Sequence, residues 1–194
     1  MDRDVVAFKQ QVEAVIVNLM RILTDGKPWE NDPNLKDTPR RVAEMYEEML
    51  GGHEFDFTTS PNKGEYTYDQ IVLLDKIPFT SLCMHHLTPF FGHASVAYIP
   101  NELIAGLSKL ARAVEHSARK LQLQETLTQE IGEFLDSVLH PVGVAVIITA
   151  EHMCIRGRGI RKPGIQTTTS FLRGAFLDKP MAREELLFLL QRGG

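Results

Sequence analysis

The sequence predicts an α+β fold, in which a mostly antiparallel sheet carries two helices on one face and follows an N-terminal helical arm. Two observations support this fold class. The first part of the chain shows only the periodicity of amphipathic helices, whereas the later part reads strand, strand, helix, helix, strand, strand. We therefore expect a helical arm over residues 1–64 and a main domain over residues 65–194 that ends in a helix.

The arm is expected to hold two helices. Apolar side chains recur at helical spacing in residues 5–23, and Gly26 ends the pattern. The second helix is expected to begin at Thr38, a good N-cap residue, and Pro39, whose fixed φ suits the first helical position. It should end before Gly51, and the polar, turn-rich stretch that follows would link the arm to the main domain.

The main domain is expected to contain four strands. Residues 71–77 and 91–99 are rich in β-prone side chains, which alternate between two faces. Residues 142–150 form a short, strongly apolar run, and residues 167–176 form a Thr-rich alternating run. A sheet of this kind has exposed edges, which favour assembly with other copies.

Three helices complete the expected main domain. Residues 107–118 and 123–138 place apolar side chains at helical spacing between the second and third strands, and residues 180–191 form a last helix. The first two of these helices would cover one face of the sheet.

Composition narrows the class of protein. Of the 194 residues, 43% are hydrophobic and 24% are charged, which is ordinary for a globular domain, and no apolar run is long enough to cross a bilayer. The net charge of −4 argues against a general nucleic-acid binder, which needs an excess of Lys and Arg. The first four residues do not resemble a secretory signal. We expect a cytoplasmic protein that binds neither membranes nor nucleic acids.

Cys83, His86 and Cys154 are the candidate metal ligands. Cys83 and His86 stand three residues apart in a loop expected between two strands, where a turn can bring both side chains to the same side. Cys154 follows the apolar strand and can supply a third ligand. Zinc held by three protein ligands keeps a position for water and lowers the pKa of that water toward neutrality. The alternative is a pair of buried thiols with surface histidines, and spacing alone does not decide between the two.

Other polar residues are candidates for proton transfer and for binding. His85 and His152 adjoin the candidate ligands and belong to the residue type that titrates near neutral pH, although each can equally be structural. Lys109 and Arg112 lie three apart near a helix start and can form a phosphate clamp or simply a solvated basic face. Glu125 follows the break between the two central helices and can accept paired hydrogen bonds from a guanine ring, or can simply be solvated.

Several motifs stand in a fixed order along the chain. Those of the main domain are Cys83-Met84-His85-His86, Gly106-Leu107-Ser108-Lys109-Leu110-Ala111-Arg112, Gln124-Glu125-x-Leu127-Thr128, Glu151-His152-Met153-Cys154-x-x-x-Arg158-Gly159 and Thr167-Thr168-Thr169-Ser170. The arm adds Asp37-Thr38-Pro39-x-Arg41-Val42-Ala43. In order and spacing these motifs resemble the GTP cyclohydrolase I family over nearly the whole chain. The departures are Met84, at a position that is often charged in the family, and Ala111, at one that is more polar in some relatives.

The resemblance implies a role for each of these residues. The zinc ligands that it implies are Cys83, His86 and Cys154, and the residues that move protons are His85, His152 and Ser108. The triphosphate contacts that it implies are Lys109, Arg112, Arg158 and Arg41. The guanine-recognising carboxylate that it implies is Glu125, with Leu107 and Gln124 as further substrate contacts.

The resemblance also implies a fold, a reaction and an assembly. The fold is the tunnelling fold, with residues 65–194 as the catalytic domain. The reaction is the zinc-dependent hydrolysis of GTP at guanine C8 to 7,8-dihydroneopterin triphosphate and formate, the first step of tetrahydrofolate and pterin biosynthesis. The assembly is a homodecamer of two stacked pentamers, with active sites at subunit interfaces.

Three other interpretations compete with this one. The strongest is the nitrile reductase of queuosine synthesis, another tunnelling-fold enzyme, which uses a cysteine nucleophile and a nicotinamide cofactor and needs no second cysteine at zinc spacing. A purely structural zinc module would fill all four coordination positions with protein ligands. A pterin-binding relative without catalysis would show a broken ligand set, whereas here the set is intact.

Overall fold

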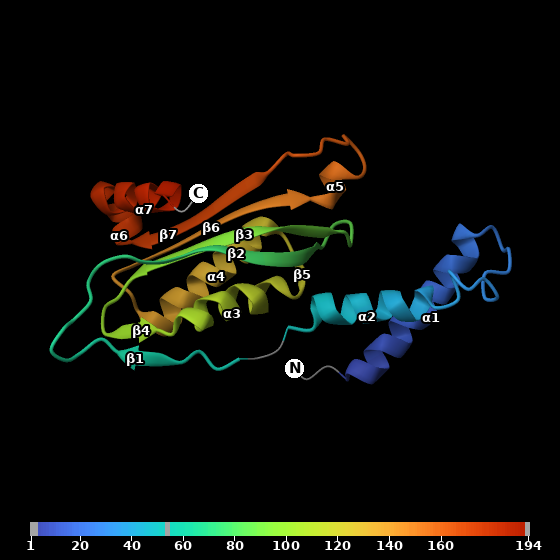
Figure 1. The fold of residues 1–194 in the computed structure, drawn as a ribbon, viewed down its shortest axis with the longest axis horizontal. Coiled ribbons are helices and arrows are strands. Elements are labelled where there is room, and N and C mark those ends of the chain that lie inside the picture. The colour runs from blue at the N-terminus through green and yellow to red at the C-terminus, as the bar shows by residue number, and fades with distance from the viewer. Residues whose placement is uncertain (1–3, 53–54, 193–194) are drawn as a thin grey trace. The chain divides into compact units, whose positions relative to one another are not determined.

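The computed structural model describes residues 4–52 and 55–192, which form two compact units (Figure 1). The first unit ends at Gly51 and the second begins at Gly52. The expected boundary after residue 64 falls inside the second unit, because strand β1 (Thr59–Pro61) pairs with strand β4 (Leu103–Ala105) of the main domain. In the described part of the chain, no helix combines the length and the apolar character needed to span a membrane.

The first unit is a pair of packed helices, α1 (Val5–Leu23) and α2 (Thr38–Leu50), and both were predicted. The side chain of Asp4 caps α1 by accepting hydrogen bonds from two backbone N–H groups of the first turn, at 3.0 and 3.1 Å. Asp37 occupies the N-cap position of α2, one residue before the expected Thr38. The hydrophobic side chains buried in this unit include Met20, Trp29 and Ala43.

The second unit is built on a five-stranded sheet in the order β5-β2-β3-β6-β7. These strands are β2 (Val72–Cys83), β3 (Pro89–Ile99), β5 (Leu121–Gln122), β6 (Gly143–His152) and β7 (Thr167–Gly174). Adjacent long strands run antiparallel to one another, and the short β5 lies parallel to the end of β2. The four predicted strands are confirmed. β2 continues past its predicted end at residue 77, so that Cys83 is its last residue.

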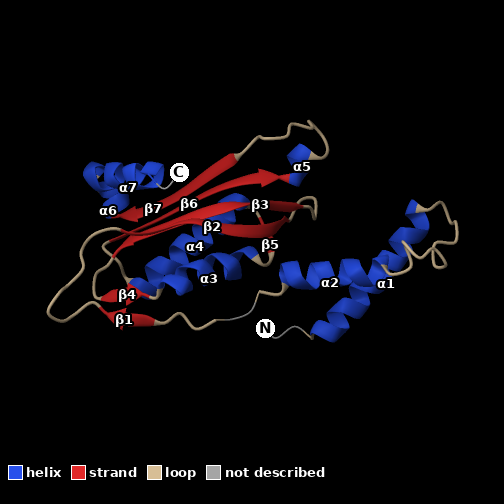
Figure 2. Cartoon of the chain, in the orientation of Figure 1, coloured by secondary structure: helices blue, strands red, loops and turns tan. Residues whose placement is uncertain are grey.

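Helices cover both faces of this sheet (Figure 2). Helices α3 (Leu107–Ala118) and α4 (Gln124–Leu139) lie on one face, as predicted. Helix α7 (Pro180–Arg192) follows the short α6 (Ala175–Asp178) and packs on the other face. The side chains fully buried between the sheet and α3 and α4 include Val96, Tyr98, Leu110, Leu127, Ile131 and Val146. Buried side chains therefore pack on both faces of the sheet, and the site forms at the ends of its strands.

Candidate metal centre and pocket

The candidate metal centre lies at one end of the sheet. Strands β2 and β6 both run antiparallel to β3, which lies between them, so their C-terminal ends lie at the same end of the sheet. Cys83 is the last residue of β2, and His152 is the last residue of β6. The register pairs Leu82 with Pro89 and Phe90 with His152. The sheet thus brings together two motifs that are far apart in the sequence.

A tight loop folds His86 back toward Cys83. The Cys83 N–H donates to the carbonyl of Thr88 at 2.9 Å, and the Cys83 carbonyl accepts from the N–H groups of His86 and Leu87 at 3.3 and 2.9 Å. Leu87 adopts a φ of 51°, in the left-handed region, which completes the turn. As a result, Sγ of Cys83 lies 3.9 Å from Nδ1 of His86.

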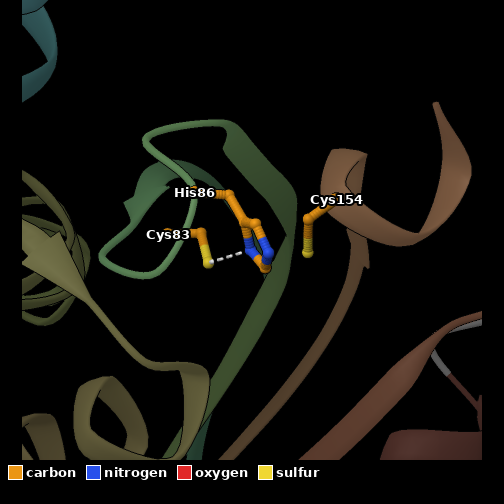
Figure 3. Close-up of side chains that lie close together, drawn as sticks. All are labelled: Cys83, His86 and Cys154. Atoms are coloured by element: carbon orange, nitrogen blue, oxygen red, sulfur yellow. Dashed lines mark hydrogen bonds between the residues drawn. The ribbon is translucent and has the colours of Figure 1, made fainter. Parts of the chain in front are cut away.

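Cys154 completes a three-residue cluster (Figure 3). It lies in α5 (Met153–Arg156), a single short helix directly after β6. One potential ligand atom from each of Cys83, His86 and Cys154 lies within 4.8 Å of the other two. Two thiolates on one zinc ion lie about 3.8 Å apart, since each Zn–S bond is about 2.3 Å long. The donor set and its spacing are consistent with the zinc site that the sequence predicts.

The surroundings of Cys154 affect the ionisation of its thiol. Burial raises the pKa of the Cys154 thiol, and the neighbouring Cys83 raises it further. The charge of Arg158 acts in the opposite direction on the same thiol. A bound cation would favour both thiolates strongly, because the thiolate is the form that coordinates metal. Three protein ligands would leave one zinc coordination position for water.

Two contacts position His152 beside the cluster. Its ring stacks on Phe90, with the ring centroids 4.7 Å apart and the planes at 1° to one another. Its Nε2 atom lies 2.8 Å from Oε1 of Gln124. Burial lowers the pKa of His152, and the nearby charge of Glu125 partly opposes this effect. The neutral imidazole is therefore favoured near pH 7.

A pocket of about 220 Å³ opens beside the cluster. The predicted site residues that line it are Cys83, His85, His86, Gln124, Glu125, His152 and Cys154. Among these, Gln124 is a buried part of the pocket wall, whereas Glu125 is exposed. The lining residues to which the sequence analysis gave no site role are Thr167, which belongs to the Thr-rich motif, and Gln122, Leu123 and Ile155. Each of the last three lies within two positions of a motif residue, and this was the only sequence signal that could have found them.

Four predicted residues belong to the first turns of α3 and do not line this pocket: Leu107, Ser108, Lys109 and Arg112. Helix α3 begins after β4 and ends just before β5 (Figure 1). Because Leu121 of β5 pairs with Leu82, it is the C-terminal end of α3 that approaches the cluster. The first turn lies about 15 Å further along the helix axis, at 1.5 Å per residue. Within one chain the first turn is therefore distant from the candidate metal centre, whereas Arg112 lies about 9 Å along the axis from the C-terminal end of α3.

The two remaining predicted residues are arginines. Arg158 is exposed in the loop that follows α5. Glu151 holds this loop, because its carboxylate accepts hydrogen bonds from Arg156 at 3.1 Å and from the N–H of Gly164 at 3.2 Å. Arg41 lies in α2 of the first unit, where it forms an ion pair with Asp37 at 3.7 Å.

Comparison with known proteins decides the family. The family model described as GTP cyclohydrolase I matches residues 13–191 of the chain. The chain belongs to the GTP cyclohydrolase I family. The predicted resemblance is confirmed, and the α+β architecture described above is the tunnelling fold of the GTP cyclohydrolase I family.

Relatives within the GTP cyclohydrolase I family match almost the full length of the chain. GTP cyclohydrolase 1 of Streptococcus agalactiae serotype V is 42% identical over 192 residues, covering 95% of this chain and 98% of its own. GTP cyclohydrolase 1 of Streptococcus suis is 45% identical over 190 residues, covering 94% of this chain and 97% of its own. GTP cyclohydrolase 1 of a Hydrogenobaculum species is 48% identical over 159 residues, covering 81% and 86% of the two chains. A solved structure, the apo form of the archaeosine synthase QueF-Like, matches 54% of this chain and 94% of its own at 19% identity, with a TM-score of 0.44.

Proposed function

We propose that this chain is a zinc-dependent GTP cyclohydrolase I that hydrolyses GTP at guanine C8 and releases 7,8-dihydroneopterin triphosphate and formate. The observation that carries the proposal is the convergence of Cys83, His86 and Cys154 in one pocket with His152. A three-ligand zinc site keeps a position for water, as a hydrolytic reaction requires. The near full-length relatives named GTP cyclohydrolase 1 support GTP as the substrate.

The metal cluster, His152, His85 and Glu125 have separate roles in this proposal. Zinc held by the cluster would supply a water molecule of lowered pKa. In its protonated form, His152 donates a proton to the imidazole nitrogen of the guanine ring and becomes neutral, and the exposed carboxylate of Glu125 accepts hydrogen bonds from the N1–H and amino groups. His85 lies next to His86, with ring centroids 6.2 Å apart, and moves protons in later steps together with Ser108. Lys109, Arg112, Arg158 and Arg41 are the proposed triphosphate contacts.

The reaction is tested by incubating the purified protein with GTP. We expect formate and a pterin that becomes fluorescent after oxidation, in equal amounts, with both lost on chelation and recovered with zinc. Absence of formate would refute the reaction, and turnover that a chelator does not affect would refute the role of the metal. The nitrile reductase alternative predicts consumption of reduced nicotinamide and no formate. The second thiol, Cys154, beside Cys83 supports the hydrolase.

We further propose that the active form is a homodecamer of two stacked pentamers. In the sheet of the described chain, β7 lies at one edge, and most of β2 is free at the other, because β5 pairs only with its last two residues. Such edges favour pairing with another chain. A neighbouring copy could also bring the first turns of its α3 to the metal centre. Sedimentation of the purified protein should give the mass of ten chains, and an active monomer would contradict the proposal.

A further inference from the structure

The side chain of Gln124 is buried, 2% exposed, and its amide group is fully engaged within the protein. Its Nε2 atom lies 3.1 Å from the carbonyl oxygen of Ile148, 2.9 Å from that of Thr167 and 3.2 Å from Oγ1 of Thr169. Carbonyl oxygens only accept hydrogen bonds, so the atom that faces them must be the NH₂ group of the amide. The partners of Gln124 therefore fix its orientation, with Oε1 toward His152.

This orientation determines which nitrogen of His152 carries a hydrogen. Oε1 of Gln124 is only an acceptor, so Nε2 of His152, 2.8 Å away, must donate. The other neutral tautomer would place two acceptors face to face and leave both without a hydrogen. Nε2 therefore carries the hydrogen of the neutral ring, and Nδ1 has a lone pair and no hydrogen.

A second set of hydrogen bonds holds Gln124 in place. Thr128, one turn further along α4, donates from Oγ1 to the backbone carbonyl of Gln124 at 2.8 Å. Oγ1 of Thr169 lies 2.6 Å from Oγ1 of Thr128. Because the Thr128 hydrogen is already used, Thr169 donates to Thr128. Helix α4 and strand β7 are thus joined by a chain of hydrogen bonds that ends at His152, and this gives a role to the Thr-rich motif of β7.

We propose that Gln124 is a positioning residue that holds His152 in the Nε2–H tautomer, so that His152 exchanges its proton with the substrate through Nδ1. Since Oε1 of Gln124 accepts from Nε2–H before and after the transfer, the ring need not reorient between the two states. Stacking on Phe90 holds the ring plane in the same way. The exchange with substrate rests on the proposed function, but the tautomer does not.

The tautomer can be read directly from ¹⁵N NMR spectra of zinc-loaded protein labelled at the histidine ring nitrogens. The His152 signals are identified by their loss in His152→Asn. In neutral His152 we expect Nε2 to give the signal of a protonated nitrogen and Nδ1 that of an unprotonated one. The reverse pattern, or an average of the two, would overturn the proposal. Because this measurement involves no GTP, its failure is distinguishable from failure of the proposed function.

Substitution of Gln124 tests the effect on turnover. Gln124→Met keeps the length of the side chain and removes the acceptor, so the two neutral tautomers should interconvert. We expect kcat to fall about tenfold or more, because a positioned proton donor contributes at least that much, while KM for GTP and zinc content change little. A folded Gln124→Met protein with the wild-type spectrum and kcat would refute the proposal. If this variant does not fold, the wild-type spectrum alone decides.

Gln122 provides a matched control. It is also buried, 1% exposed, and its Nε2 donates to the carbonyl of Ser117 at 3.0 Å and to Glu130 at 2.7 Å. Gln122→Met, like Gln124→Met, removes buried hydrogen bonds and should lower stability, but it should leave the His152 spectrum unchanged. If both variants alter that spectrum equally, the effect is general loosening of the pocket and the proposal fails.

Discussion

Sγ of Cys83 lies 3.9 Å from Nδ1 of His86, and a ligand atom of Cys154 lies within 4.8 Å of both. Removing one of the three would leave a two-ligand site, which binds zinc poorly. We expect Cys154→Ala to lose most of its zinc, measured by elemental analysis, and most of its formate release from GTP. The adjacent Met153→Leu should keep both. A Cys154→Ala protein with full zinc and full turnover would show that the cluster is not the metal site.

Loss of either pocket histidine outside the metal cluster should lower turnover without loss of zinc. His85 and His152 both line the pocket but lie outside the three-residue cluster. We expect His85→Ala and His152→Ala each to lower turnover of GTP by about a hundredfold, the usual contribution of a positioned proton donor or acceptor. Zinc content should remain that of the wild type. Near-normal turnover in both variants would contradict the assignment.

Mixing of variants tests whether active sites lie between subunits. Lys109 lies in the first turn of α3, about 15 Å along the helix from the end near the cluster. If a site takes its cluster from one chain and Lys109 from another, Cys154→Ala and Lys109→Ala should each be inactive alone. Mixed oligomers from co-expression should regain part of the activity, because some sites then hold both intact residues. Mixed oligomers as inactive as the separate variants would place the whole site in one chain.

Gly132 allows α4 to lie closely against β7. A Cβ atom added at Gly132 would lie 2.2 Å from the ring of Phe171, which belongs to the core. In an exposed helix, Gly→Ala stabilises by about 1 kcal/mol. Here we expect the opposite sign, a loss of about 1–3 kcal/mol, because the ring must move. Thermal or urea unfolding measures this, and Phe171→Leu added to Gly132→Ala should recover part of the loss. An increase in stability for Gly132→Ala would show that the ring is free to shift.

Because of Tyr98, the free energy of unfolding should depend on pH in the alkaline range. Its hydroxyl is fully buried and accepts a hydrogen bond from the N–H of Ala105 at 2.9 Å. Burial raises the pKa of Tyr98 above 10.0, while the hydrogen bond from Ala105 lowers it. The folded state therefore keeps the proton at pH values where the unfolded state has lost it, so the stabilisation is full below pH 10 and declines as the pH rises above 10.

The comparison for this pH effect is Tyr98→Phe. At neutral pH the variant should be less stable by about 1–3 kcal/mol, because the buried N–H of Ala105 loses its acceptor. Above pH 10 its stability should decline less steeply than that of the wild type. Urea unfolding from pH 7 to pH 11 measures both effects. Parallel curves for the two proteins would exclude ionisation of Tyr98 as the cause.

The sequence predicts those features that depend on local patterns. Periodicity was sufficient to predict α1, α2, α3, α4 and α7 and the four long strands. The metal cluster was predictable because Cys83, His86 and Cys154 stand at strand ends, where loops carry functional side chains. Strand β5 has only two residues and pairs in parallel with β2, so no local sequence pattern predicts it. The boundary of the helical arm was missed for the same reason, because β1 has only three residues.

The place of Gln124 depends on long-range register and could not be predicted. Its amide is oriented by carbonyl groups of Ile148 and Thr167, which belong to two different strands, β6 and β7. The sequence assigned Gln124 to the substrate through its motif alone. Likewise, the stack of His152 on Phe90 follows only from the pairing of β3 with β6. Neither relationship can be read from spacing within one motif.

The pairing of β6 with β3 also restricts how the site can change during evolution. Side chains alternate between faces along a strand, so insertion of one residue within β6 would turn His152 to the opposite face. Residues 157–166 connect α5 to β7 outside the paired strands, so their number can vary without disturbing either register. Insertions are therefore compatible with the loop that carries Arg158, but an insertion within β6 would displace His152 from the pocket.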